Sequence, residues 1–158
     1  EKDFVIREYQ REDKESVLGL LRLNTPDYFG YEEEPYFIHY LDHELEYYFV
    51  LEVNNIIAGC GGFNFAASET SVKISWDMFH PGYQGRSLGT ALLNYRIEKI
   101  KQFDKVQKIG VRTSQQAWKF YEKNGFKLFE TIKDYWAPGF DLYNMEYTPS
   151  AKERNSQP

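Results

Sequence analysis

One short segment of the chain carries residues whose types and spacing suit ligand chemistry. It reads Phe79-His80-Pro81-Gly82-Tyr83-Gln84-Gly85-Arg86-Ser87-Leu88-Gly89-Thr90, and it connects a strand-like run over Ser71–Met78 to a helix-like run over Ala91–Lys101. The first backbone N–H groups of a helix lack intrahelical acceptors, and the helix dipole adds partial positive charge there. A phosphate group can accept hydrogen bonds from these N–H groups. The segment therefore predicts a site for a phosphorylated ligand.

Two common phosphate-binding motifs do not fit this segment. Walker A needs four residues between its glycines and a lysine after the second, whereas three residues separate Gly85 from Gly89 and Thr90 follows. The dinucleotide motif G-x-G-x-x-G is absent as well. The pattern that is present is Gln84-x-x-Ser87-x-Gly89, with Arg86 inside it as a cation. This pattern alone does not identify the phosphorylated ligand, so further motifs in the chain are needed.

A second block follows further along the chain, with the sequence Ala117-Trp118-Lys119-Phe120-Tyr121-Glu122-Lys123-Asn124-Gly125-Phe126. Together the two blocks resemble the GNAT superfamily of acyl-CoA-dependent N-acyltransferases. The first is similar to its loop [RQ]-x-x-G-x-[GA], and the second to its A-x-x-[FL]-Y-x-[KR]-x-G-F block. The resemblance implies direct transfer of an acetyl group from acetyl-CoA to a primary amine in a ternary complex. The alternative is a non-catalytic acyl-CoA sensor or partner module on the same fold.

The resemblance also implies which residues hold acetyl-CoA. Phe79 matches the position whose backbone N–H faces the thioester oxygen, an oxyanion-hole role. Ser87 replaces a glycine of the loop, and we expect binding to survive this change if φ at Ser87 is below zero. Ser114 stands where many members have asparagine. The residues expected to contact acetyl-CoA are Phe79, Gln84, Gly85, Arg86, Ser87, Leu88, Gly89, Thr90, Ser114 and Tyr121.

Amine acetylation needs a neutral amine and a proton for the departing thiolate. In the resembled family a tyrosine of the second block often donates that proton, and Tyr121 matches it; the alternative is that Tyr121 is a core aromatic residue. Asp77 lies two residues before Phe79 and is the candidate base, with a solvated or capping carboxylate as the alternative. His80 is a second candidate base because an imidazole titrates near neutral pH. A chain of water molecules could serve instead of either side chain.

In the resembled family the first two helices and their loop form the acceptor wall. In this chain Tyr28, Phe29 and Tyr31 lie in that region, among the acids Asp27, Glu32, Glu33, Glu34, Asp42, Glu44 and Glu46 and the aromatics Tyr36 and Tyr40. Aromatic rings and carboxylates attract cations, so we expect a small cationic amine or a peptide amine as acceptor. The alternative is that the acids are solvated and the rings serve packing. The segment from Lys133 to Met145 partly resembles the end of members that acetylate peptide N-termini.

Two other sets of reactive residues favour structural roles. His39 and His43 are spaced i, i+4 and could face one metal ion, but no further residue with ligand spacing joins them, so we expect no metal. Cys60 lies between two glycines in a predicted inner strand, where a small buried residue is the better interpretation.

The elements that must position these residues follow from periodicity and turn residues. Strands are predicted over Phe4–Tyr9, Tyr47–Val53, Ile56–Phe65, Thr70–Met78, Lys108–Arg112, Lys127–Trp136 and Asp141–Thr148. Helices are predicted over Glu12–Leu23, from Pro35 to about Leu45, over Ala91–Lys101 and over Ser114–Asn124. This order predicts one α/β domain over residues 1–148 and a polar tail over 149–158. The resemblance adds a central, mostly antiparallel, twisted sheet of about six to seven strands, with helices on both faces and strands splayed at the acyl-CoA site.

Composition limits the possible partners. The chain has 158 residues, a net charge of −5 and a pI of about 5.3, which argues against nucleic-acid binding. No apolar run approaches the ~20 residues of a membrane span. A single cysteine permits no intrachain disulfide and suits a reducing cytoplasm. The exposed character of the late strands makes a homodimer a reasonable expectation.

Overall fold

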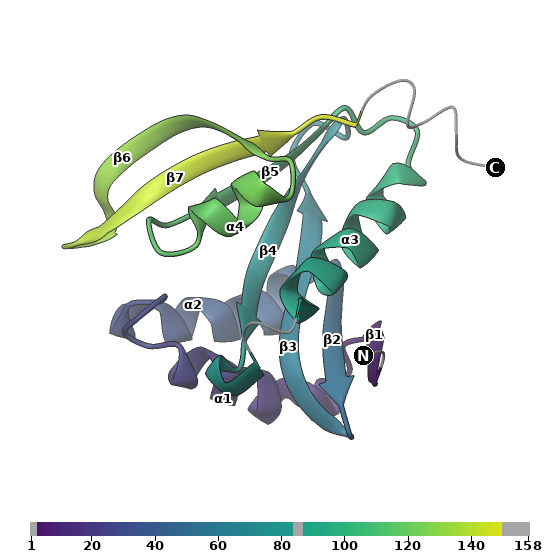
Figure 1. Ribbon diagram of the computed structural model, residues 1–158, viewed down its shortest axis with the longest axis vertical. Helices are drawn as coiled ribbons and strands as arrows, with labels where there is room; N and C mark the ends of the chain where they lie inside the picture. The colour runs from purple at the N-terminus through teal and green to yellow at the C-terminus, as the bar shows by residue number, and fades with distance from the viewer. Residues whose placement is uncertain (1–2, 84–86, 150–158) are drawn as a thin grey trace. The chain divides into compact units, whose positions relative to one another are not determined.

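Strands and helices alternate along the chain in an order close to the predicted one. The computed structural model describes residues 3–83 and 87–149 (Figure 1). The strands are β1 (Phe4–Glu8), β2 (Tyr47–Val53), β3 (Ile56–Phe65), β4 (Ser71–Phe79), β5 (Lys108–Thr113), β6 (Lys127–Ala137) and β7 (Phe140–Tyr147). The α-helices are α1 (Lys14–Leu23), α2 (Glu34–His39), α3 (Leu88–Lys101) and α4 (Trp118–Lys123).

The hairpin of β2 and β3 has the bounds that the sequence predicts. Its two-residue turn consists of Asn54 and Asn55, whose φ angles are 52° and 66°. Left-handed conformations at both positions match the right-handed twist of the flanking strands, and asparagine tolerates them better than most residues. The predicted bounds of these two strands are therefore confirmed.

The strands form one mixed sheet, and the chain is a single α/β domain. The sheet contains seven strands in the order β1-β2-β3-β4-β5-β7-β6. The pairs β1–β2, β2–β3, β5–β7 and β6–β7 are antiparallel, and β4–β5 is parallel. The register between β4 and β5 covers only three residue pairs, Ser71 to Lys73 against Lys108 to Gly110. The predicted fold class is confirmed.

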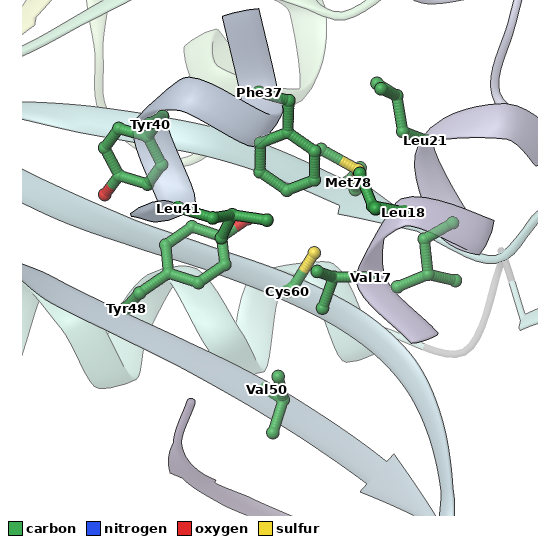
Figure 2. Close-up of a cluster of buried hydrophobic side chains, with 11 residues drawn as sticks. Val17, Leu18, Leu21, Phe37, Tyr40, Leu41, Tyr48, Val50, Cys60 and Met78 are labelled. Carbon is green, nitrogen blue, oxygen red and sulfur yellow. The ribbon is translucent and has the colours of Figure 1, made fainter. Parts of the chain in front are cut away.

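The described residues gather into two compact units. The first comprises the chain up to Asn64 together with Ser75–Tyr95, and the second comprises Phe65–Ile74 together with the chain from Arg96. Figure 2 shows the core of the first unit, where side chains from the segment of α1 and from the segment of α2 point toward β2, β3 and β4. This cluster contains Val17, Leu18, Leu20, Leu21, Phe37, Tyr40, Leu41, Tyr48, Val50, Cys60 and Met78.

Within the first unit, helices cover both faces of the sheet. Tyr48 and Val50 of β2 face α1 and α2 in the core cluster. Because side chains alternate along a strand, Phe49 points to the opposite face, where its ring meets Tyr95 of α3 at 5.3 Å. Of the helices described, α3 is the longest with 14 residues, and none is long and apolar enough to cross a membrane.

In the second unit, α4 ends as the sequence predicts. Gly125 has a φ of 98°, and its N–H donates to the carbonyl of Glu122 at 3.1 Å. The N–H of Phe126 donates to the carbonyl of Tyr121 at 3.0 Å, and the two rings lie 5.5 Å apart. These two bonds and the ring contact form a Schellman motif, which needs a left-handed residue at Gly125.

The four predicted helices differ in their bounds from those in the structure, and the second and fourth differ most. The helix predicted over Ser114–Asn124 begins later than expected: α4 starts at Trp118 without a side-chain cap, and the Ser114 carbonyl accepts bonds from the N–H groups of Ala117 and Trp118 in a preceding turn. The second helix also changes character, because a π-turn over Tyr40–Glu44 follows α2. A wider turn shifts the side chains away from the i, i+4 spacing of an α-helix.

Candidate active site

A backbone irregularity in β4 lies next to Asp77 and Phe79, two of the residues that the sequence predicts for the site. Trp76 has a φ of 44°, a conformation that is unusual for a bulky residue and typical of functional sites. The hydroxyl of Tyr48 donates a hydrogen bond of 2.6 Å to the Trp76 carbonyl. Complete burial raises the pKa of Tyr48 well above its usual range, so the hydroxyl keeps its proton. Periodicity alone places Trp76 in a regular strand and gives no signal for this geometry.

Aromatic side chains surround Trp76. Its ring lies 4.8 Å from Phe37 and 6.4 Å from Tyr40, and Phe29 stacks on it at 6.0 Å. Tyr40 is buried, and its hydroxyl donates to Asn64 at 2.9 Å. For Tyr40 the packing interpretation therefore holds. Phe29, half-buried, connects the predicted acceptor segment to the strand that carries Asp77, which is half-buried as well.

At the end of β4, the backbone of Phe79 is held from two sides. The N–H of His80 donates to the Ala58 carbonyl of β3 at 2.8 Å, and the Phe79 carbonyl accepts a bond of 2.9 Å from the side chain of Asn24. In an extended strand the N–H and C=O of one residue point to the same side, and those of the next residue point to the other. The Phe79 N–H is therefore directed away from β3, while the Phe79 ring packs over Gly59.

The predicted phosphate loop is described only in part. Gln84, Gly85 and Arg86 lie outside the described residues. Ser87 is exposed with a φ of 60°, and its carbonyl accepts the N–H of Ala91 at 3.1 Å. The φ of Ser87 lies above zero, so the condition under which we expect CoA binding to survive the replacement of glycine by Ser87 is not met. Leu88 is buried, whereas Gly89 and Thr90 are half-buried in the first turn of α3, where backbone N–H groups lack intrahelical acceptors.

The left-handed Ser87 leads to a prediction about stability. Glycine adopts positive φ without steric cost, whereas a non-glycine residue loses about 1 kcal/mol there. Ser87→Gly is therefore expected to raise the thermal unfolding midpoint by about 2–4 °C, as measured by calorimetry. Ser87→Ala keeps the strained φ and removes the hydroxyl, so it separates the two contributions. A lower midpoint in the glycine variant than in the wild type contradicts the strain argument.

Two further residues that the sequence predicts for the site, Ser114 and Tyr121, lie in the second unit. Tyr121 on α4 is buried, with ring centroids 5.0 Å from Phe120 and 5.5 Å from Phe126. Ser114 is buried in the turn between β5 and α4. The packing interpretation of Tyr121 thus describes its ring, and the proposed acid role concerns its hydroxyl, so the two are compatible.

The turn after β5 also holds the tip of the β6–β7 hairpin, which sequence reasoning missed. The Gln115 side chain donates to the Gly139 carbonyl at 2.6 Å and accepts the Asp141 N–H at 2.8 Å. The indole N–H of Trp136 donates to the Thr113 carbonyl at 3.1 Å. The Gln115 side chain makes the two hydrogen bonds that a neighbouring strand would otherwise make with the backbone. No local sequence pattern predicts this role, because Gly139 and Asp141 lie more than twenty residues away.

The predicted acceptor segment contains both packed and exposed rings. Tyr28 is half-buried, whereas Tyr31 is 76% exposed and Tyr36 is 69% exposed. Two of the acids are paired with cations: Glu34 with Arg22 at 2.8 Å and Asp42 with Lys14 at 2.9 Å. These exposed ion pairs reduce the negative charge that a cationic acceptor would meet.

His39 and His43 lie close together, with ring centroids 4.9 Å apart, and His39 Nε2 is 3.4 Å from a Glu44 carboxylate oxygen. Over residues 3–83 and 87–149, no group of three or more histidine, cysteine, aspartate or glutamate side chains has an arrangement that could hold a metal ion. Cys60 is fully buried in the core, as its sequence context predicts.

Comparison with known proteins relates this geometry to a family. Residues 15–126 match the model of the acetyltransferase (GNAT) family. Two relatives, each an N-alpha-acetyltransferase, are from Sulfurisphaera tokodaii, 29% identical, and Saccharolobus solfataricus, 26% identical; each alignment covers 91% of this chain and 92% of the relative. An aminoglycoside 6′-N-acetyltransferase solved in complex with coenzyme A superimposes with a TM-score of 0.74 at 17% identity, covering 91% of this chain and 96% of that one.

The family match spans the elements from α1 to the Schellman motif of α4, including both blocks on which the sequence resemblance rests. The helix start after β4 is where the sequence predicts the pyrophosphate site. Ser114 and Tyr121, both buried, remain predicted contacts of acetyl-CoA. The chain therefore belongs to the GNAT family and is an acetyl-CoA-dependent acetyltransferase.

Proposed function

We propose that this enzyme acetylates the α-amino group of a peptide or protein. The observation that carries the proposal is the likeness, over nine-tenths of the chain, to two proteins named N-alpha-acetyltransferase. The acceptor segment is consistent with it, because two of its carboxylates are neutralised by Arg22 and Lys14. A site for a polycation would benefit from free carboxylates, whereas one α-ammonium group needs few.

The proposed mechanism assigns a role to each of the residues that the sequence predicts as catalytic. Acetyl-CoA supplies the acetyl group as a thioester. The amides at the start of α3 and the preceding loop bind its pyrophosphate, and the Phe79 N–H, which points away from β3, donates to the thioester oxygen. Asp77 accepts the proton of the incoming amine, directly or through water, and the Tyr121 hydroxyl donates a proton to the departing thiolate.

A small cationic amine is the second candidate acceptor. The exposed rings of Tyr31 and Tyr36 favour it, because an exposed aromatic face attracts ammonium groups. Both candidates use the same transfer chemistry and differ in what the acceptor wall recognises.

An acceptor panel tests the proposal. Purified protein is given acetyl-CoA and either short peptides with free N-termini, the same peptides with blocked N-termini and a free lysine, or small amines such as spermidine and an aminoglycoside. CoA thiol release is expected with the free N-termini and not with the blocked ones. Release with small amines alone contradicts the peptide acceptor and favours the second candidate.

A homodimer through β6 is also part of the proposal. β6 is an edge strand, and Phe129 and Ile132 on it are 57% and 39% exposed. The charges on β6 sum to zero, because Lys127 and Lys133 balance Glu130 and Asp134, whereas the whole chain has a net charge of −5. Electrostatic repulsion between two copies is therefore weaker where two β6 strands pair than elsewhere on the surface.

Sedimentation equilibrium measures this association. The wild type is expected at twice its 18.7 kDa chain mass, and Phe129→Lys at the mass of one chain. Val5→Lys is the matched control, because Val5 is 58% exposed on β1, the opposite edge strand. A monomeric wild type, or a monomeric Val5→Lys variant, argues against pairing through β6.

A further inference from the structure

We infer that Asn24 is a positioning residue for the acetyl-transfer step, holding the thioester-binding end of β4 in register with the acceptor segment. The inference rests on the proposed roles of Phe79, Tyr28 and Phe29. It concerns a residue that lies in neither motif and has no reactive side chain.

Asn24 makes hydrogen bonds in three directions from a buried position. It is 3% exposed and follows the last residue of α1. Its side-chain Nδ2 donates to the Leu20 carbonyl at 2.8 Å and to the Phe79 carbonyl at 2.9 Å. Its backbone carbonyl accepts the N–H groups of Tyr28 at 2.8 Å and Phe29 at 3.2 Å. One residue therefore contacts both the predicted acceptor segment and the predicted thioester site.

The bond to Phe79 fixes the orientation of a reactive backbone group. The Phe79 carbonyl and N–H point to the same side of β4, so a donor on the carbonyl restrains the direction of the N–H as well. The next peptide N–H, that of His80, is held by Ala58 on the other side. A misplacement of about 1 Å at a reacting centre can cost up to roughly 100-fold in rate, so this restraint matters for turnover.

A chemically similar residue elsewhere in the chain lacks the second bond. Asn124 follows the last residue of α4, as Asn24 follows that of α1, and its Nδ2 donates to the Phe120 carbonyl four residues earlier at 2.8 Å. Among the described residues, the Asn124 side chain thus bonds only within its own helix end. The bond from Asn24 to Phe79, 55 residues away, is therefore an addition to the ordinary helix-end contact.

Asn24→Ser is the sharpest test of the inference. A serine hydroxyl can reach the carbonyl four residues earlier, as Thr25 does next door with a bond of 2.8 Å to Leu21, but it is too short to reach Phe79. Asn24→Ser is expected to lower kcat roughly tenfold or more while the KM for the amine and the Kd for acetyl-CoA stay near wild-type values. Asn124→Ser is the control and is expected to keep kcat.

The outcomes separate this inference from the proposed function. Unchanged kcat in Asn24→Ser, with thermal unfolding shifted as in Asn124→Ser, makes Asn24 a helix cap only and overturns the inference. If Asn24→Ser does not fold, Asn24→Asp is the second variant. It keeps the size of the side chain, but a carboxylate cannot donate a hydrogen bond to the Phe79 carbonyl. A folded Asn24→Asp variant with wild-type kcat also overturns the inference. If the wild type acetylates a small amine but no peptide, the proposed acceptor class is wrong and the inference about Asn24 is still testable. The variants are then compared with that amine as the acceptor.

Discussion

Tyr121→Phe is expected to lower kcat by about 10²–10⁴-fold, the usual contribution of a positioned general acid. The substitution keeps the ring that packs on Phe120 and Phe126 and removes only the hydroxyl. Acetyl-CoA affinity and the thermal unfolding midpoint are therefore expected to stay near wild-type values. Steady-state kinetics with the best acceptor, together with calorimetry for acetyl-CoA, measures both.

Tyr147→Phe is the matched control for this prediction. The Tyr147 ring also packs on Phe126, at 5.4 Å, and Tyr147 lies outside both motifs. Loss of its hydroxyl is expected to leave kcat unchanged. Equal turnover in Tyr121→Phe and the wild type removes the acid role from Tyr121 and leaves it as a packed aromatic residue.

Asp77→Asn is expected to lower kcat/KM by about 100-fold or more, because asparagine cannot accept the proton of the amine. Steady-state kinetics with the best acceptor measures this loss. The side chain keeps its size, so the fold around the Trp76 irregularity is expected to persist.

Glu69→Gln serves as the comparison for Asp77→Asn. Glu69 is an exposed carboxylate just before β4, and Glu69→Gln removes one negative charge, as Asp77→Asn does. Because Glu69 has no role in the proposed mechanism, kcat/KM is expected to stay at the wild-type value. An Asp77→Asn variant that keeps the full rate points instead to a chain of water molecules, or to His80, as the base.

Local sequence predicts the parts of the fold that local physics determines. The two asparagines of the β2–β3 turn and Gly125 after α4 each occupy left-handed positions, which depend on the residue itself and its neighbours. The start of α4 was not predictable in the same way. A serine or threonine at a helix start is common, yet here the Ser114 backbone carbonyl closes a separate turn first.

Long-range contacts decide the geometry of the candidate site. The irregularity at Trp76 depends on the Tyr48 hydroxyl 28 residues away, and the restraint on Phe79 depends on Asn24, which is 55 residues away. Tyr40 and Phe29 belong to the segment whose composition suggests cation binding. In the structure their rings pack around Trp76, because three elements meet there. No periodicity or spacing in one segment encodes which distant partner a side chain will find.

The sequence by itself determined the chemistry of this protein: two motifs at their proper elements establish an acetyl-CoA-dependent acetyltransferase, because backbone donors and glycines in a fixed order are local properties. The tertiary structure alone decided how the ends of β4 and α1 are held, and it placed Ser87 in a left-handed conformation that the residue type does not favour. The reason is physical. Local order depends on the residues in the segment, whereas the direction of a buried polar group depends on the partner that folding brings to it.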